Sequence, residues 1–106
     1  MKPSKKEIIV SIQRRLAATI PAGAKAILFG SQARGDANED SDWDILILLD
    51  KEKALDDDFN QVAYPLFELG WQIGAMINPI LYTYKEWEKR HFTLFYKNIE
   101  QEGVVL

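Results

Sequence analysis

The sequence has no cysteine and one histidine, His91, among its 106 residues. The absence of cysteine excludes a disulfide framework, a thiolate metal site and a cysteine nucleophile, and it fits a reducing compartment. A single histidine excludes a metal site built from several histidines of this chain. The longest apolar run, Ile45 to Leu49, is far shorter than the roughly 20 residues of a membrane span. We therefore expect a cytoplasmic protein that has no membrane segment.

Positive charge is also scarce, because 13 lysines and arginines stand against 16 aspartates and glutamates, for a net charge of −3. Gripping a phosphate backbone takes many lysine and arginine contacts, so this balance argues against nucleic acid as the main partner. The 47% hydrophobic and 27% charged residues are typical of a globular domain. A chain of 106 residues suits one domain, residues 1–106, and leaves a homo-oligomer open.

Capping patterns and apolar spacing predict an alternation of helices and strands. Ser4 followed by Glu7 is a capping-box pattern, and the apolar residues after it recur at helical spacing up to about residue 19. The elements predicted next are a strand at 24–29, a turn or short helix within 30–41, a strand at 42–50, a helix from about 55 to 70 with a break near residue 64, a strand at 75–84, and short helices after Thr83 and Thr93. This order predicts a small α/β or α+β domain.

Gly30 and Ser31 come directly after the first predicted strand. A glycine lets a phosphate approach the backbone, and a serine hydroxyl adds a hydrogen-bond donor. A helical turn that starts at residue 31 would direct its free N–H groups at the same anion. The pair therefore predicts a phosphate-binding bend, with an unliganded helix N-cap as the alternative.

Asp42 and Asp44 begin the second predicted strand, whose apolar residues face both ways. The strand period of two puts both carboxylates on one face and Trp43 on the other. Paired acids that enter an apolar strand are costly unless something compensates their charge. Mg²⁺ is commonly held by one or two carboxylates together with substrate phosphates. The two acids beside the bend therefore predict metal-assisted phosphoryl or nucleotidyl transfer.

The motif FGSQARG, residues 29–35, is followed by the two aspartates with ten residues between Ser31 and Asp42. This pattern, within about residues 24–50, resembles the minimal nucleotidyltransferases of the DNA polymerase β-like superfamily. The resemblance implies a polymerase β-like fold, a small mixed sheet flanked by helices. It implies that Gly30, Ser31 and Arg34 bind ATP or another nucleoside triphosphate, and that the catalytic residues Asp42 and Asp44 hold Mg²⁺ in a site that can take two metal ions. The implied reaction transfers a nucleotide, typically AMP, with release of pyrophosphate.

The third strand departs from this family pattern. Many members carry a third carboxylate there, which completes the metal site and helps to deprotonate the acceptor, whereas this chain has Asn78. An amide oxygen can contact a metal but cannot act as a general base. Two interpretations stay open: an enzyme that takes a carboxylate from elsewhere, such as Asp56 to Asp58 or a partner chain, or triphosphate binding with slow or no turnover.

The resemblance also implies a partner. Short members are commonly encoded beside a HEPN-domain protein in a toxin–antitoxin pair, where the nucleotidyltransferase is the antitoxin and can AMPylate a tyrosine of the toxin. The alternatives to such an enzyme are an antitoxin that neutralises its partner by complex formation alone and a regulatory domain that meets other subunits through its third strand. Arg34 could instead pair with Asp36, and we expect His91 to be a surface or cap residue.

Overall fold

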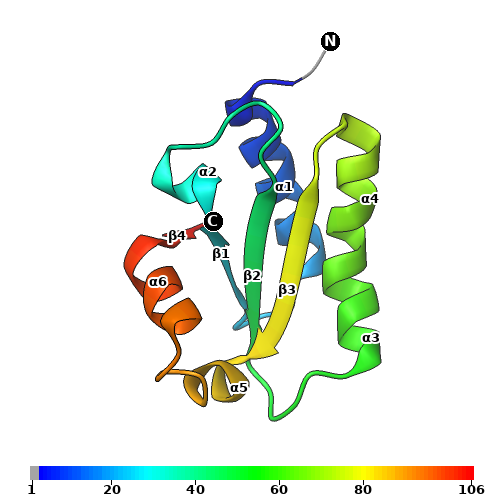
Figure 1. The fold of residues 1–106 in the computed structure, drawn as a ribbon. Helices are drawn as coiled ribbons and strands as arrows, with labels where there is room; N and C mark the ends of the chain where they lie inside the picture. The colour runs from blue at the N-terminus through cyan, green and yellow to red at the C-terminus, as the bar shows by residue number, and fades with distance from the viewer. Residues whose placement is uncertain (1–2) are drawn as a thin grey trace.

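The computed structural model describes residues 3–106, which form a mixed four-stranded sheet with helices on both of its faces (Figure 1). The elements in chain order are α1 (Lys5–Thr19), β1 (Lys25–Phe29), α2 (Ser31–Arg34), β2 (Trp43–Leu49), α3 (Asp56–Asp58), the π-helical turn η1 (Phe59–Ala63), α4 (Tyr64–Ile73), β3 (Ile77–Thr83), α5 (Tyr84–Glu88), α6 (Leu94–Glu102) and β4 (Val104–Val105). The predicted mixed class and the predicted order are confirmed.

The strands lie in the order β3-β2-β1-β4, with β1 antiparallel to β2 and to β4, and β2 parallel to β3. The apolar strand β2 is therefore central, and β3, which contains Pro79, is an edge strand, the usual place for a proline within a sheet. The pairing sets Phe29 opposite Asp44 on one side and Asp44 opposite Asn78 on the other. Three strands thus bring the glycine bend, the acids and Asn78 to the same end of the sheet.

Alternate residues of β2 supply two apolar clusters on the two faces of the sheet. One cluster packs Ile45 and Ile47 against α1, η1 and α4, and the other packs Leu46 against α5 and α6. Trp43 is buried in the first cluster, as period two predicts, so its side chain points away from the face of Asp44. Full burial of an isoleucine or leucine contributes roughly 1.5–3 kcal/mol, so both layers hold β2 in place.

The helix ends follow local signals. Ser4 and Glu7 form the predicted capping box of α1, and Thr83 and Glu86 form a second one at α5. The predicted break near residue 64 is the turn η1, after which Pro65 lies in the first turn of α4. Pro65 has no N–H to donate to the preceding turn, which explains the break.

Strand β4 has no counterpart among the predicted elements. It consists of Val104 and Val105, which pair with Leu28 and Ile27 of β1. A strand of two residues has no periodicity to detect, and its partner is far away in the sequence. Its pairing anchors the end of α6 against β1. No helix in the stretch from Pro3 to Leu106 is long and apolar enough to cross a membrane.

Candidate functional site

Asp42, Asp44 and Asn78 meet where β2 and β3 begin. The Asn78 Nδ2 atom donates to Asp42 Oδ2 at 2.8 Å and lies 3.4 Å from Asp44 Oδ1. Asp42 is exposed, whereas Asp44 and Asn78 are half-buried. The two carboxylates therefore lie on one face, as predicted, and one amide nitrogen bridges them.

Gly30 lies against Asp44. A Cβ atom placed on Gly30 would lie 2.5 Å from Asp44 Oδ2, which is closer than any side chain can approach. The backbone of Gly30 has φ 77° and ψ −158°, a conformation that is essentially restricted to glycine. Glycine is thus needed at this position for two reasons, the backbone angle and the carboxylate beside it.

Ser31 is the first residue of the short helix α2, directly beyond the glycine. Its side chain is half-buried, and the Gly30 carbonyl accepts hydrogen bonds from the N–H groups of Ala33 and Arg34. The N–H groups at the start of a helix have no acceptor within the helix. With the N–H groups of Ala33 and Arg34 bonded to the Gly30 carbonyl, the N–H groups of Ser31 and Gln32 and the Ser31 hydroxyl are the donors that the bend can offer to an anion.

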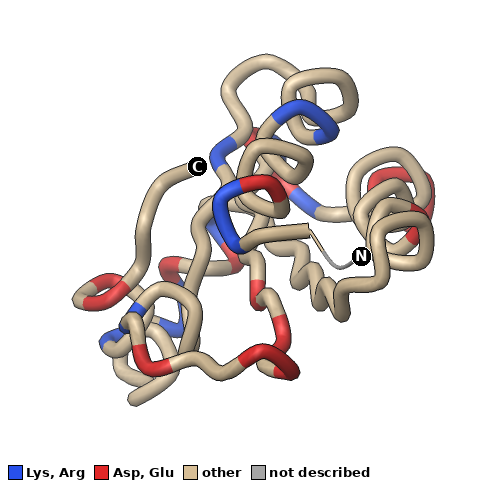
Figure 2. The backbone as a smooth tube through the Cα atoms, turned by 90° about the horizontal axis from the view of Figure 1, so that it is seen from above, with Lys and Arg blue, Asp and Glu red and all other residues tan. Residues whose placement is uncertain are grey.

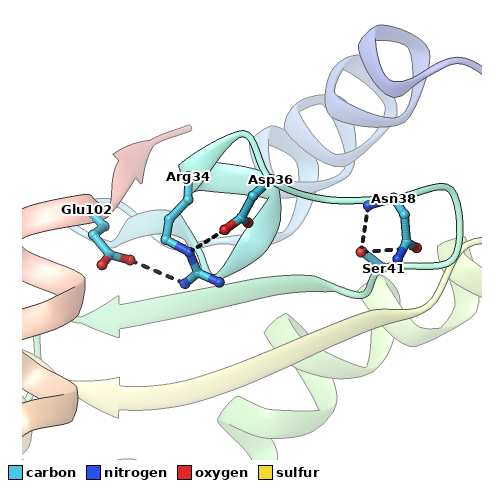
Figure 3. A network of polar contacts seen from close by, with 5 residues as sticks. All are labelled: Arg34, Asp36, Asn38, Ser41 and Glu102. Atoms are coloured by element: carbon cyan, nitrogen blue, oxygen red, sulfur yellow. Dashed lines mark hydrogen bonds and ion pairs between the residues drawn. The ribbon is translucent and has the colours of Figure 1, made fainter.

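Arg34 lies at the end of α2, where two carboxylates hold its guanidinium group (Figure 3). Its Nε lies 3.2 Å from Asp36 Oδ2, and its Nη1 lies 3.4 Å from Glu102 Oε2 of α6. The hydrogen bond to Asp36, followed by the one to Glu102, raises the pKa of Arg34 above its ordinary value. The alternative contact with Asp36 is thus present, and a phosphate would have to compete with both carboxylates.

The loop that leads from α2 into Asp42 is held by short-range polar contacts. The Ser41 hydroxyl lies 3.3 Å from Asn38 Oδ1 and accepts from the Asn38 N–H at 2.9 Å (Figure 3). Gln32 of α2 donates through Nε2 to the Ser41 carbonyl at 3.3 Å. These contacts fix the position of Asp42 relative to the bend.

The structure separates other candidate residues from this site. Asp56, Asp57 and Asp58 start α3 at the far end of β2 (Figure 1), and Asp58 is bound to Lys51 and to the Leu55 N–H. The idea that these acids supply a third carboxylate is therefore wrong. His91 is exposed after α5, with its Nδ1 atom 2.8 Å from the Glu88 carbonyl oxygen, which fits the expected surface position.

The donor set suits a small hard cation. The carboxylate oxygens of Asp42 and Asp44 both lie within reach of one nitrogen atom, so both can converge on one ion. Between Pro3 and Leu106 no three histidine, aspartate or glutamate side chains form a metal-binding group. Two carboxylates and an amide match the Mg²⁺ sites that are completed by substrate phosphates.

Two surface features lie outside this constellation. A groove of about 730 Å³ runs beside residues 38–41, and its walls include Ile8, Phe67, Trp71 and Met76, but neither Asp42 nor Asp44. In Figure 2, lysine and arginine positions are interspersed with acidic ones along the backbone. We assign no role to the groove, because the chemistry-bearing side chains lie elsewhere.

Sequence reasoning missed one residue next to the site, Glu102, which holds Arg34 from 68 positions away. No motif surrounds Glu102, so only the packing of α6 beside α2 reveals it. Asn78 was identified by its place on the third strand, but its hydrogen bonds to both acids depend on the register of β3 against β2.

Comparisons with known proteins show the family of this chain. Residues 6–106 match the sequence profile of the family described as "Nucleotidyltransferase domain". A Methanocaldococcus jannaschii protein named "Putative protein adenylyltransferase MJ0604" is 40% identical over 82 residues, which cover 77% of this chain and 76% of that protein. The "Protein adenylyltransferase MntA" of Aphanizomenon flos-aquae is 49% identical over 39 residues, which cover 37% of this chain and 26% of that protein.

A solved structure shares the fold at low sequence identity. It is described as "Crystal structure of the toxin-antitoxin with AMP-PNP", and it superposes with a TM-score of 0.64 at 18% identity, covering 91% of this chain and 69% of the other.

Proposed function

This chain belongs to the nucleotidyltransferase domain family and is a nucleotidyltransferase enzyme, and from that premise we propose that it transfers AMP from ATP to a hydroxyl group of a partner protein, with Mg²⁺. The observation that carries the proposal is the contact between the glycine bend and the acid pair: Asp44 Oδ2 would lie 2.5 Å from a Cβ on Gly30. A phosphate at the bend is thereby next to the carboxylates.

In this proposal the bend binds the triphosphate of ATP or of another nucleoside triphosphate. The Ser31 hydroxyl and the first N–H groups of α2 donate to phosphate oxygens. Arg34 adds a charge-assisted contact when it exchanges Asp36 or Glu102 for a phosphate. Gly30 lets the bend lie against Asp44, because any side chain there would collide with that carboxylate.

Asp42 and Asp44 are the residues that would hold Mg²⁺ in the proposed site. One or two Mg²⁺ ions held there would neutralise phosphate charge and favour in-line displacement at the α-phosphorus. In the reaction, the acceptor oxygen forms a bond to the α-phosphorus, the bond from that phosphorus to the pyrophosphate oxygen breaks, and pyrophosphate leaves. Asn78 has no basic atom, so among the three side chains only the two aspartates can take the acceptor proton.

AMP transfer to a protein is supported by the two relatives described above, one named a protein adenylyltransferase and the other a putative protein adenylyltransferase. The neighbour described as a toxin-antitoxin with AMP-PNP supports a role as the antitoxin of such a pair. We propose that the partner and acceptor is a HEPN-domain protein, the partner that the sequence resemblance implies, and that a tyrosine of this protein receives the AMP.

The test uses ATP labelled in the α-phosphate, Mg²⁺ and a HEPN-domain protein as the proposed partner. We expect the wild-type chain to label the partner, and label in the γ-phosphate to stay off it, because pyrophosphate leaves. The double variant Asp42→Asn, Asp44→Asn should lose roughly a hundredfold or more of the rate. The double variant Asp56→Asn, Asp57→Asn makes the same charge change at the exposed start of α3 and should label the partner at the wild-type rate.

Equal labelling by the Asp42 and Asp44 double variant would remove these acids from the mechanism. A second result is also informative. Toxin inhibition that persists in that variant, with no mass increase on the partner, would favour neutralisation by complex formation.

A further inference from the structure

The acid pair has an unusual partner for two carboxylates, because the group that joins them is neutral. Asn78 Nδ2 lies 2.8 Å from Asp42 Oδ2 and 3.4 Å from Asp44 Oδ1, and an NH₂ group has two hydrogens to donate. Among residues 3–106 no lysine, arginine or histidine forms an ion pair with either aspartate. The amide is thus the side chain that offsets their mutual repulsion.

We infer that Asn78 is a positioning residue for cation binding, an inference that rests on the proposed function. Its amide nitrogen keeps the carboxylates of Asp42 and Asp44 converged before a cation arrives. A cation that binds at these two carboxylate oxygens would lie beside the N–H hydrogens of Asn78, whose partial positive charge repels it. Rotation of the amide about its last side-chain bond exchanges Nδ2 for Oδ1, which is a ligand for hard cations.

The surroundings of Asn78 support this role. The side chain is half-buried on the edge strand β3, and the parallel register fixes its backbone opposite Asp44. The backbone of Asn78 is therefore fixed by the sheet, whereas its side-chain amide is not enclosed. The amide can rotate without moving the sheet. The three side chains together carry a charge of −2 rather than the −3 that a third carboxylate would give, so affinity for a free cation is lower than the site could reach.

The experiment measures Mn²⁺ binding by calorimetry, in the absence of nucleotide, for the wild-type chain and three variants. Asn78→Ala removes both the bridge and the oxygen ligand, so we expect the dissociation constant to rise several-fold. Asn78→Asp adds a carboxylate, so we expect a fall of tenfold or more. Asn60→Asp adds the same charge at an exposed position of η1 and should change the constant less than twofold.

A second readout follows the amide itself. The side-chain NH₂ signals of Asn78 in a nitrogen-15 spectrum are identified by their absence in Asn78→Asp. They should move saturably as Mg²⁺ is added to the wild-type chain, and they should not move in the double variant Asp42→Asn, Asp44→Asn.

The outcomes separate the two claims. Mn²⁺ binding by Asn78→Ala at wild-type affinity or tighter, or NH₂ signals that stay fixed while Mg²⁺ binds, would overturn the role of Asn78 and leave the acid pair in place. Mn²⁺ binding that is the same in the wild-type chain and in the Asp42 and Asp44 double variant, or that is absent from both, would overturn the metal site and with it this inference.

Discussion

Gly30 and Asp44 are in direct contact across β1 and β2, since a Cβ atom on Gly30 would lie 2.5 Å from Asp44 Oδ2. The pair joins the two halves of the site, because Gly30 begins the bend before α2 and Asp44 lies near the start of β2. The contact makes the shape of the bend and the position of the carboxylate depend on each other.

Replacing Gly30 with alanine should therefore damage both stability and the site. A non-glycine residue in this region of φ and ψ costs about 1–3 kcal/mol, and the displaced Asp44 adds to that cost. We expect urea denaturation to show a loss in that range or above it, together with weaker Mg²⁺-dependent nucleotide binding.

Gly35→Ala is the matched control. Gly35 also has a positive φ, 85°, but a Cβ there would meet no atom within 4 Å. We expect a loss of about 1–2 kcal/mol from the backbone alone, with nucleotide binding unchanged. If both alanine variants bound nucleotide like the wild-type chain, the contact between Gly30 and Asp44 would have no role in the site.

Most of the fold could be predicted because its signals are local. Ser4 with Glu7, and Thr83 with Glu86, mark helix starts within four residues, and the apolar run of β2 marks a strand covered on both faces. Strand β4 could not be predicted, because two valines become a strand only through their pairing with β1.

The candidate site also has residues that could be predicted from local sequence patterns and residues that could not. Period two alone placed Asp42 and Asp44 on one face, and Gly30 was predicted from its place after a strand. The position of Asn78 depends on the register between β2 and β3, and that of Glu102 depends on the packing of α6. Neither of these two positions follows from sequence spacing. The roles assigned to these residues in catalysis remain predictions.

The contact between Arg34 and Glu102 predicts competition with the nucleotide. An exposed ion pair contributes roughly 0.2–1 kcal/mol, so Glu102→Gln should remove the ion pair at Nη1, with Asp36 still at Nε, and tighten binding of a non-hydrolysable ATP analogue by a factor of about 1.5–5. Arg34→Ala should weaken it by roughly tenfold or more, because a hydrogen bond to a charged group is lost. Calorimetric titration at low ionic strength measures both effects.

Glu39→Gln makes the same charge change on the loop and should leave the affinity unaltered. If Arg34→Ala also leaves the affinity unaltered, Arg34 only holds the loop through Asp36 and Glu102.

The hydrogen bond that Tyr96 donates predicts a loss of stability at high pH. Its hydroxyl donates to Glu88 Oε1 at 2.7 Å, and this hydrogen bond, more than burial, raises the pKa of Tyr96 from 10 to about 12. Because the pKa is raised on folding, the contribution is fully present below pH 10 and is lost as the pH rises through about 12. The free energy of unfolding should therefore fall more over this interval in the wild-type chain than in Tyr96→Phe.

Tyr64→Phe, a change at an exposed tyrosine of α4, is the control. Its free energy of unfolding should fall over this interval as much as that of the wild-type chain. Denaturant titrations across the interval give the comparison. Parallel falls in the wild-type chain and Tyr96→Phe would show that the hydrogen bond to Glu88 contributes nothing.

The central claim is that Asp42 and Asp44 hold a cation beside a triphosphate bound at Gly30 and Ser31. Calorimetric titration of a non-hydrolysable ATP analogue, with and without Mg²⁺, tests it most directly in the wild-type chain and in the double variant Asp42→Asn, Asp44→Asn. We predict that Mg²⁺ tightens binding by tenfold or more in the wild-type chain and has no effect in the double variant. Equal tightening in both proteins, or none in the wild-type chain, would contradict the account.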